Sequence, residues 1–453
     1  MGKLFGTDGV RGVAGTELDC TLAFAVGKAG AIVLTSHKNG TKAPTILIGK
    51  DTRISGDMLE AALIAGICSA GANVVKLGVV PTPAVAYLTR KYEADAGVVI
   101  SASHNSMEYN GIKFFNFEGF KLPDDVEDEI EDLILNNKLK NPEYEKTGAE
   151  IGRVTECETA IFDYVAFAKS TVNSPLTGLK LAVDCANGAT YKTSLMTLSE
   201  LGAELTILSD RPDGININDN CGSTHLENLK KAVVENKCDA GVAFDGDGDR
   251  MLAVDEKGNV VDGDQIMAIC AKDMLEKGEL TGKTVVATVM SNLGLTIAAK
   301  ENGFNIKQTA VGDRYVLEQM RQTGEVLGGE QSGHVIFLNH NTTGDGLVSA
   351  LKLLEILKKS GKTLSELAGI MKVLPQVMVN ATVPNNKKEA FHAHEGIKKE
   401  IEKLETALLG EGRVLIRPSG TEPLVRVMLE GKDIEFLEKE ARRLADYITK
   451  ELA

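Results

Sequence analysis

The amino-acid sequence lacks most of the features that mark secreted, membrane-spanning or nucleic-acid-binding proteins. Tryptophan is absent, and seven cysteines are scattered through the 453 residues without a CxxC pair. This pattern indicates reduced thiols rather than disulfides or a zinc site. The longest uncharged stretches, such as residues 61–75, are shorter than the ~18 residues of a membrane span. Asp8 and Arg11 stand where a secretory signal would need an apolar core, so we expect a cytoplasmic protein with no membrane partner.

Positive charge is also in short supply. The 50 lysines and arginines are outnumbered by 64 aspartates and glutamates, which gives a formal net charge of −14, and no Lys/Arg-rich block occurs. Because nucleic-acid binders neutralise phosphates with clustered cations, a nucleic-acid partner is excluded. An anionic substrate would therefore need a locally basic cleft to attract it.

One pattern of residues occurs three times along the chain. It consists of a β-branched strand, a polar turn containing glycine, a helix, a glycine near the helix end and a second strand, and the copies span residues 45–78, 179–209 and 283–310. Each copy is typical of a βαβ unit, which predicts parallel strand pairs.

A second apolar segment follows in each copy and runs straight into a polar loop containing glycine. These segments are residues 96–105, 240–250 and 324–334. In open α/β sheets, ligands bind beyond the carboxyl ends of the strands. We therefore predict that the three strand ends form three walls of one site.

The remaining segments complete a prediction of four domains. Residues 123–132 carry seven acids in ten residues and predict a solvated helix that closes the first domain. After residue 373 the pattern becomes strand, helix, two strands flanking a turn, and a last helix. The fold class is therefore α/β, with three similar α/β domains of mixed or parallel sheets and a C-terminal α+β domain around a central cleft. The predicted boundaries are 1–152, 153–255, 256–372 and 373–453.

Three aspartates alternate with glycine at the end of the second of these strands. Asp245, Asp247 and Asp249 would repel one another unless a cation neutralised them, and their hard oxygen ligands suit Mg²⁺. Two alternatives stay open, a calcium loop and a plain acidic turn. Glu256 falls at the twelfth position of a calcium loop, but Arg250 occupies the sixth, where such a loop needs glycine.

The other two loops and a late turn supply further candidates. SASHN places Ser101, Ser103, His104 and Asn105 together, where a serine near Mg²⁺ suits phosphoryl transfer, although such residues also populate ordinary turns. Candidate contacts to sugar hydroxyls are Glu330, Ser332 and His334. A candidate phosphate cradle, or else a plain turn, is formed by Arg417, Ser419, Gly420 and Thr421, with Arg426 as a further cation.

Six motifs, in order, resemble those of the α-phosphohexomutases over the whole length of the chain. They are FGTDGVRG (5–12), KDTRISG (50–56), SASHN (101–105), DGDGDR (245–250), GGEQSGH (328–334) and RPSGTEP (417–423). VGDRYVLE (311–318) and the chain length are most similar to the bacterial members that act on glucosamine phosphates. One departure is Ser106, where many relatives have proline; it restores an N–H and frees φ, so the loop gains mobility.

The resemblance implies an enzyme that interconverts glucosamine 6-phosphate and glucosamine 1-phosphate on the path to UDP-N-acetylglucosamine and the cell wall. It further implies Mg²⁺ as cofactor and glucosamine 1,6-bisphosphate as activator and intermediate, and it allows a homodimer. Ser103 matches the phosphoserine, whose phosphate joins Asp245, Asp247 and Asp249 as a metal ligand. Arg11, His104 and Lys113 match groups that support proton transfer and charge. The sugar contacts match Glu330 and Ser332, and the site of the non-reacting phosphate matches Arg417, Ser419, Gly420 and Thr421.

Two rival functions share these residues. A phosphomannomutase/phosphoglucomutase would use the same motifs, and a metal-dependent sugar-phosphate phosphatase could use the same aspartates. The sugar is therefore predicted from the resemblance alone.

Overall fold

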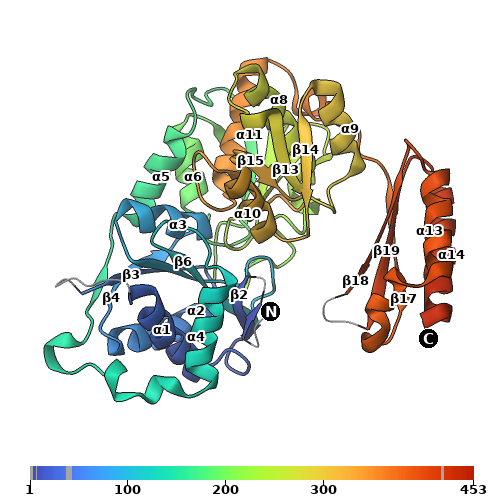
Figure 1. Cartoon of the computed structure of the whole chain (residues 1–453). Coiled ribbons are helices and arrows are strands. Elements are labelled where there is room, and N and C mark those ends of the chain that lie inside the picture. The colour runs from blue at the N-terminus through green and yellow to red at the C-terminus, as the bar shows by residue number, and fades with distance from the viewer. Residues whose placement is uncertain (1–3, 7, 37–42, 420–422, 453) are drawn as a thin grey trace. The chain divides into compact units, whose positions relative to one another are not determined.

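The computed structural model describes residues 4–6, 8–36, 43–419 and 423–452. The chain divides into two compact units (Figure 1), one of residues 1–290 and 304–370 and one of residues 291–303 and 371–453. Within the described ranges, no helix combines the length and hydropathy that a membrane span requires. All seven cysteines are free thiols, as the sequence predicts.

A seven-stranded sheet opens the larger unit, with strand order β1-β2-β6-β5-β3-β4-β7. Strands β3, β4, β5 and β7 are parallel, whereas the pairs β5-β6, β6-β2 and β2-β1 are antiparallel. The strands are Phe5–Gly6 (β1), Gly9–Val13 (β2), Thr45–Lys50 (β3), Asn73–Val79 (β4), Ala96–Ile100 (β5), Tyr109–Asn116 (β6) and Val154–Glu156 (β7). Strand β7 adds to this sheet residues that lie beyond the boundary predicted at 152.

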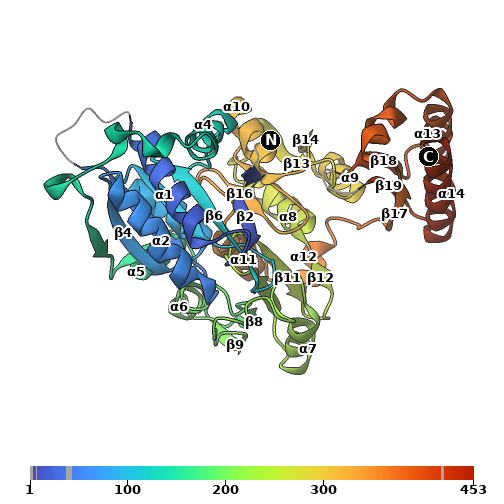
Figure 2. The same ribbon diagram turned by 90° about the horizontal axis from the view of Figure 1, so that it is seen from below.

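Helices α1, α2 and α4 cover one face of the first sheet, and α3 packs against the other face. Their bounds are Cys20–Thr35 (α1), Ser55–Ser69 (α2), Thr82–Lys91 (α3) and Asp124–Leu135 (α4), followed by the 3₁₀ turns Lys138–Lys140 (η1), Pro142–Tyr144 (η2) and Gly148–Glu150 (η3). Figure 2 shows α1 and α2 side by side. Gly66 permits this approach, because a Cβ there would lie 2.1 Å from the Phe24 carbonyl oxygen.

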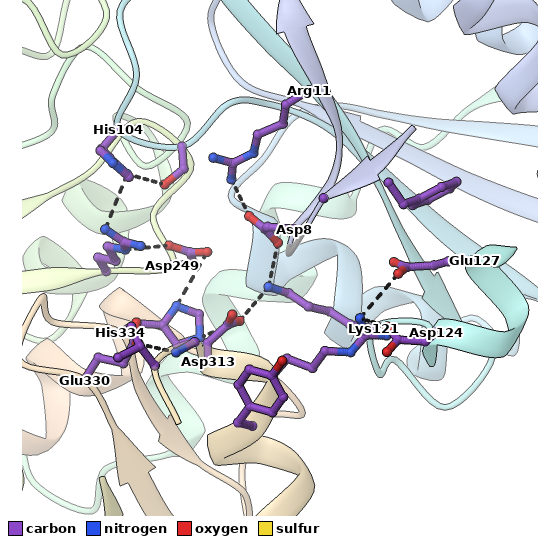
Figure 3. Close-up of a pocket in the computed structure, with 18 of the residues that line it drawn as sticks. Asp8, Arg11, His104, Lys121, Asp124, Glu127, Asp249, Asp313, Glu330 and His334 are labelled. Carbon is purple, nitrogen blue, oxygen red and sulfur yellow. Dashed lines mark hydrogen bonds and ion pairs between the residues drawn. The ribbon is translucent and has the colours of Figure 1, made fainter. Parts of the chain in front are cut away.

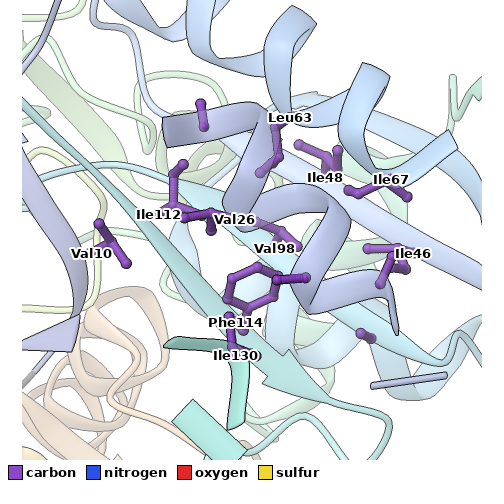
Figure 4. Close-up of a cluster of buried hydrophobic side chains, with 14 of the residues drawn as sticks. Val10, Val26, Ile46, Ile48, Leu63, Ile67, Val98, Ile112, Phe114 and Ile130 are labelled. Atoms are coloured by element: carbon purple, nitrogen blue, oxygen red, sulfur yellow. The ribbon is translucent and has the colours of Figure 1, made fainter. Parts of the chain in front are cut away.

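The core of this domain follows the two-residue period of its strands. Ile46 and Ile48 of β3 and Val98 of β5 point toward α1 and α2 (Figure 4), where they meet Val26 and Leu63. Every one of these five side chains is fully buried. Alternation on a strand places successive side chains on opposite faces, so both faces of the sheet carry a core.

The acidic helix α4 differs from the predicted solvated helix. Ile130 and Leu133 are buried against the first core, and Glu131 accepts hydrogen bonds from the backbone N–H groups of Leu4 and Phe5 at 2.7 and 2.6 Å. The apolar residues among the seven acids hold α4 to the domain, so only part of the helix faces solvent.

The second and third domains each contain one of the predicted βαβ units. Their sheets have the orders β12-β11-β10-β8-β9 and β14-β13-β15-β16, and the pairs β8-β9 and β13-β14 are parallel. The strands are Lys180–Asp184 (β8), Glu204–Leu208 (β9), Ala240–Phe244 (β10), Met251–Asp255 (β11), Val260–Val261 (β12), Thr284–Thr288 (β13), Asn305–Thr309 (β14), Leu327–Gly329 (β15) and Val335–Phe337 (β16). With the parallel pair β3-β4, all three predicted repeats are confirmed.

Among the described residues, seven helices and one 3₁₀ turn belong to these two domains. They are Ala160–Ser170 (α5), Thr193–Glu200 (α6), Glu227–Glu235 (α7), Gly263–Glu276 (α8), Asp313–Thr323 (α10), Gly346–Ser360 (α11) and Leu364–Ala368 (α12), with a 3₁₀ turn at Thr281–Lys283 (η4). A capping box formed by Thr363 and Glu366 starts α12.

The smaller unit contains an antiparallel sheet of order β17-β19-β18. Its elements are Leu293–Asn302 (α9), Gln376–Thr382 (β17), Asn385–His392 (η5), Glu395–Ala407 (α13), Arg413–Pro418 (β18), Leu424–Glu430 (β19) and Ile434–Leu452 (α14). Leu437, Leu444 and Ile448, on one face of the last helix, are fully buried against Val425 and Val427. This antiparallel arrangement distinguishes the fourth domain from the first three.

Candidate active site

The three predicted strand ends meet at one polar cavity of about 560 Å³ in the larger unit (Figure 3). Ser103 and His104 follow β5, Asp249 and Arg250 follow β10, and Glu330 follows β15 directly. Each of these strands is internal to its sheet, so hydrogen-bonded neighbours hold its carboxyl end on both sides. The arrangement brings the three loops to one place, as the repeat pattern predicts.

Ser103 lies at the centre of this arrangement. Its Oγ donates a hydrogen bond to Asp245 Oδ2 at 2.6 Å and lies 3.3 Å from His104 Nδ1. Its backbone has the left-handed value φ 53°, which is uncommon for a residue other than glycine. Ser101 serves the loop instead, because its Oγ donates to Asp51 at 2.5 Å and accepts the Ser103 N–H at 3.0 Å.

Asp245, Asp247 and Asp249 form a buried carboxylate cluster. One ligand oxygen from each lies within 4.8 Å of the others. Among the described residues, no hydrogen-bond donor reaches Oδ1 of Asp247 or of Asp249, although both atoms are buried. Buried carboxylate oxygens without donors suit a hard divalent cation such as Mg²⁺. The cluster therefore fits a metal site better than a plain acidic turn.

The calcium-loop alternative is contradicted by the position of Glu256. Its Oε1 accepts a hydrogen bond from Ser365 Oγ at 2.5 Å, and its Oε2 accepts the Ser365 N–H at 3.1 Å. The side chain therefore caps helix α12 and does not join the three aspartates.

The pKa values of the cluster show how strongly it needs positive charge. Burial, together with the neighbouring Asp247 and Asp249, raises the pKa of Asp245 well above its usual value. Burial also acts to raise the pKa of Asp247, but Lys113, together with the hydrogen bond from Thr82, more than offsets this effect and holds that pKa low. Without a further cation, one carboxyl of the cluster tends to keep its proton; a dication removes that tendency.

Lys113 lies behind the loop of residues 245–249, which we call the aspartate loop, and does not line the cavity. Its Nζ lies 2.9 Å from Oδ2 of both Asp247 and Asp8, and its side chain is almost fully buried. Thr82 Oγ1 donates to the same Asp247 oxygen at 2.7 Å. Lys113 therefore orients Asp247, and its predicted part in supporting charge at the reacting oxygen stays a prediction.

A chain of alternating charges extends from Lys113 along the cavity floor. Asp8 also accepts from Arg11 and pairs with Lys121 Nζ at 2.6 Å, and Lys121 in turn pairs with Asp313 at 2.5 Å. Asp8 and Asp313 lie within the FGTDGVRG and VGDRYVLE motifs, but sequence reasoning gave neither a role. Apart from Arg11, three positions from Asp8, their charged partners are remote in the chain, so the local sequence does not mark them.

His104 and Arg250 form the opposite wall. Arg250 donates from Nη1 to His104 Nδ1 at 3.3 Å. Burial, Arg250 and Arg11 lower the pKa of His104 to about 4. The imidazole is therefore neutral near pH 7, and because a guanidinium can only donate, Nδ1 carries no proton.

The predicted sugar loop is only partly in the cavity. Glu330 lines it and accepts the Gly312 N–H through Oε1 at 3.1 Å. His334 also lines it, but its ring accepts the Gly344 N–H at Nε2 and faces Asp249 Oδ2 at 3.6 Å through Nδ1. Ser332 is exposed and does not line the cavity.

Arg314 ties the acidic helix α4 to the cavity wall. Its guanidinium pairs with Asp124 and lies 3.4 Å from Glu127, and it donates to the Leu122 carbonyl at 2.6 Å. Burial outweighs the effect of Arg314 and raises the pKa of Glu127 to about 7. The acidic run thus contributes to the site, which its composition alone did not reveal.

The cavity is not the basic cleft expected from the net charge. Among the described residues, the carboxylates that line it outnumber the lysine and arginine side chains; they are Asp8, Asp124, Glu127, Asp128, Asp249, Asp313 and Glu330. Several of these acids hold Lys121, Arg11 or Arg314 in place. The acids therefore serve to fix cations, and a metal ion would supply further positive charge.

In the smaller unit, two arginines lie opposite each other on neighbouring strands. Arg417 of β18 lies directly across the sheet from Arg426 of β19. Partial burial and the neighbouring Arg426 lower the pKa of Arg417. Like charges on opposed strand positions are unfavourable unless an anion separates them. Ser419, directly after β18, is buried, and the predicted Gly420 and Thr421 lie outside the described residues.

Comparison with known proteins extends over the whole chain. Residues 2–141, 162–258, 262–374 and 378–448 match the models for domains I, II, III and the C-terminal domain of phosphoglucomutase/phosphomannomutase. Phosphoglucosamine mutases of Clostridium novyi and Acetivibrio thermocellus are 62% and 60% identical, covering 99% and 100% of both chains. A solved phosphoglucomutase/phosphomannomutase family protein from Burkholderia thailandensis matches with a TM-score of 0.79 and 25% identity over 98% of this chain and 97% of its own.

Replacing Asp247 with asparagine tests the metal site. The amide keeps the shape and can still accept from Thr82 and Lys113, but it removes one negative charge, so we expect Mn²⁺ affinity to fall at least about tenfold, or ~1.4 kcal/mol. Titration of Mn²⁺ followed by electron paramagnetic resonance measures this. Asp57→Asn is the matched control, because that side chain is 86% exposed. Unchanged Mn²⁺ affinity in a folded Asp247→Asn protein would contradict the assignment.

Proposed function

The chain belongs to the phosphoglucomutase/phosphomannomutase family and to its phosphoglucosamine mutases, and we propose that it interconverts glucosamine 6-phosphate and glucosamine 1-phosphate through phosphorylated Ser103. The observation that carries the proposal is the hydrogen bond from Ser103 to Asp245, which places a serine hydroxyl directly against three buried aspartates at the cavity wall. A hydroxyl beside a metal-ligand set is the arrangement that phosphoryl transfer requires.

The reaction consists of two transfers in opposite directions. In the first, the bond between phosphorus and Ser103 Oγ breaks, a bond from phosphorus to the free sugar hydroxyl forms, and the hydroxyl proton ends on Oγ. The product is glucosamine 1,6-bisphosphate. In the second, the bond between the other phosphorus and its sugar oxygen breaks, a bond from this phosphorus to Ser103 Oγ forms, and the Oγ proton ends on the released sugar oxygen.

Residues around Ser103 carry the proton and stabilise the charge of the transferred group. His104 is neutral near pH 7 and lies 3.3 Å from Oγ, so it is available to carry the proton. Arg11 and Arg250 both line the cavity and stabilise phosphoryl oxygens. Lys113 keeps Asp247 ionised and oriented.

Asp245, Asp247 and Asp249, with the Ser103 phosphate as a further ligand, would hold Mg²⁺, which neutralises the charge that develops on the transferred group. His334 supports this loop by facing Asp249. These residues form the cofactor site of the proposed enzyme.

Substrate contacts come from two further groups of residues. Glu330 is an acceptor for sugar hydroxyls, and exposed Ser332 of the same loop is the second proposed contact. Arg417, Ser419, Gly420, Thr421 and Arg426 bind the phosphate that does not react. The opposed pair Arg417 and Arg426 supports this role, because a phosphate dianion relieves the repulsion between two guanidinium groups. A homodimer stays a prediction.

Ser103 is expected to carry the phosphoryl group. Intact-protein mass spectrometry of the protein incubated with glucosamine 1,6-bisphosphate should show the added mass of one phosphoryl group, which phosphatase removes. Ser103→Ala should never gain this mass. Ser101→Ala is the control and should still gain it, because the Ser101 hydroxyl is occupied by Asp51. Phosphorylation of Ser103→Ala would overturn the mechanism.

Glucosamine 6-phosphate is expected to be the preferred substrate. We expect its kcat/KM to exceed that of glucose 6-phosphate and mannose 6-phosphate at least about tenfold, which needs only ~1.4 kcal/mol of transition-state binding. A coupled assay with catalytic bisphosphate measures the isomer, and a parallel assay measures free phosphate. Equal use of mannose 6-phosphate would favour the phosphomannomutase/phosphoglucomutase alternative, and release of phosphate without isomerisation would favour a phosphatase.

Arg417→Ala is expected to weaken substrate binding. Loss of a charged hydrogen bond to phosphate costs ~1.5–3 kcal/mol, so KM should rise roughly ten- to hundredfold while Ser103 still becomes phosphorylated. Steady-state kinetics measures the change. Arg442→Ala, which removes an exposed arginine of α14, should leave KM unchanged. An unaltered KM in Arg417→Ala would show that its turn is not the phosphate site.

A further inference from the structure

Ser103 has a left-handed backbone, with φ 53°, which its surroundings must stabilise. A residue with a Cβ in this region costs on the order of 1–3 kcal/mol and persists only where its surroundings fix it. Because φ and ψ set the direction of the Cα–Cβ bond, the same conformation decides where Oγ points. The Ser103 carbonyl group is held by two side chains, one from each of the first two domains.

Arg53, from the turn between β3 and α2, is the first of these side chains. Its Nη2 donates to the carbonyl oxygens of Ser103 and Asn105 at 3.0 and 2.8 Å, and its Nη1 donates to the carbonyl oxygen of Ser106. The guanidinium is fully buried, and Asp51 fixes its Nε at 2.9 Å. A planar fork of donors can hold several carbonyl groups at once, which a lysine ammonium cannot do with the same geometry.

Ser106 stands where many relatives have proline, and Arg53 binds its carbonyl oxygen. Because φ of serine is not fixed by a ring, the sequence predicts a more mobile loop here. Arg53 binds the Ser106 carbonyl and thereby restricts the segment that proline would otherwise stiffen.

Asn218, from the segment between β9 and α7, is the second side chain. Its Nδ2 donates to the same carbonyl oxygens, those of Ser103 at 2.9 Å and Asn105 at 3.0 Å. Asn218 is itself left-handed, with φ 59°, and is buried. The aspartate loop, residues 245–249, also packs closely against the Ser103 carbonyl oxygen, because a Cβ on Gly246 would lie 2.5 Å from that oxygen.

We infer that Arg53 and Asn218 are positioning residues, which hold the Ser103 carbonyl group from both domains so that Oγ stays aimed at Asp245. This inference rests on the proposed function. Neither side chain lines the cavity, and neither bonds to Ser103 Oγ, so both act through the backbone. Because the two side chains bind the same two carbonyl groups, the second domain contributes to the geometry of a nucleophile that the first domain carries.

Asn218→Gly is the variant that isolates this role. Glycine accepts φ 59° without strain, so the variant removes the amide and keeps the local backbone. Asn220→Gly is the matched control: Asn220 is also left-handed, with φ 51°, but it is exposed, and within the described part of the chain its Nδ2 bonds only to Asp219, at 2.8 Å. Arg53→Lys is a second variant, which keeps the charge beside Asp51.

The experiment is rapid-quench transfer of the phosphoryl group from fully phosphorylated protein to glucosamine 6-phosphate, with KM and Mn²⁺ affinity measured alongside. We expect Asn218→Gly to lower the transfer rate constant about 10- to 100-fold, with KM, Mn²⁺ affinity and melting temperature close to those of Asn220→Gly. Arg53→Lys should lower the same constant by at least as much.

The possible outcomes separate the inference from the function. A transfer rate in Asn218→Gly equal to that of Asn220→Gly would overturn the inference, and so would a loss confined to KM or to Mn²⁺ binding. An equal loss in both asparagine variants would also overturn it, because the effect would then belong to the loop in general. Failure of the wild-type protein to transfer any phosphoryl group would instead overturn the proposed function.

Discussion

The mutual repulsion of three buried carboxylates is the constraint on which the rest of the site depends. Two buried oxygens of Asp247 and Asp249 have no donor among the described residues. Burial lowers the effective dielectric and so strengthens the repulsion among the three carboxylates. A fold can keep such a cluster only if positive charge is close. Lys113 supplies part of it at Asp247, and Asp245 accepts a hydrogen bond from the serine that carries the phosphoryl group in the proposed reaction.

The same need for balance explains why the cavity contains so many acids. Asp8 and Asp313 hold Lys121, and Asp124 with Glu127 holds Arg314, so each cation is fixed by a carboxylate before a substrate arrives. Fixed charges lose little entropy when a phosphate binds, and they need no reorganisation during transfer. A site made only of free lysines would attract an anion more strongly but would orient it less well.

Rigid anchoring of the nucleophile complements this electrostatic order. The Ser103 loop follows an internal strand, its carbonyl groups are bound by Arg53 and Asn218, and Ser101 accepts its N–H. The left-handed backbone of Ser103 is the cost of aiming Oγ at Asp245, and these bonds offset it. Strain at one functional residue is thus supported by residues that touch no reactant.

The sequence by itself determined the three βαβ repeats, the strand ends that carry Ser103, Asp245 and Glu330, and the apolar face of α14. These features follow from periodicity and turn chemistry within a few residues, which local patterns report directly. Only the tertiary structure decided that Ser101 binds Asp51, that Lys113 stands behind the aspartate loop, and that α4 reaches the cavity. Each of these features depends on partners that are far away in the chain. The same holds for the anchoring of Ser103, since 115 positions separate it from Asn218. Contacts of that kind arise when whole sheets pack together, and no local pattern encodes which side chains they bring into contact.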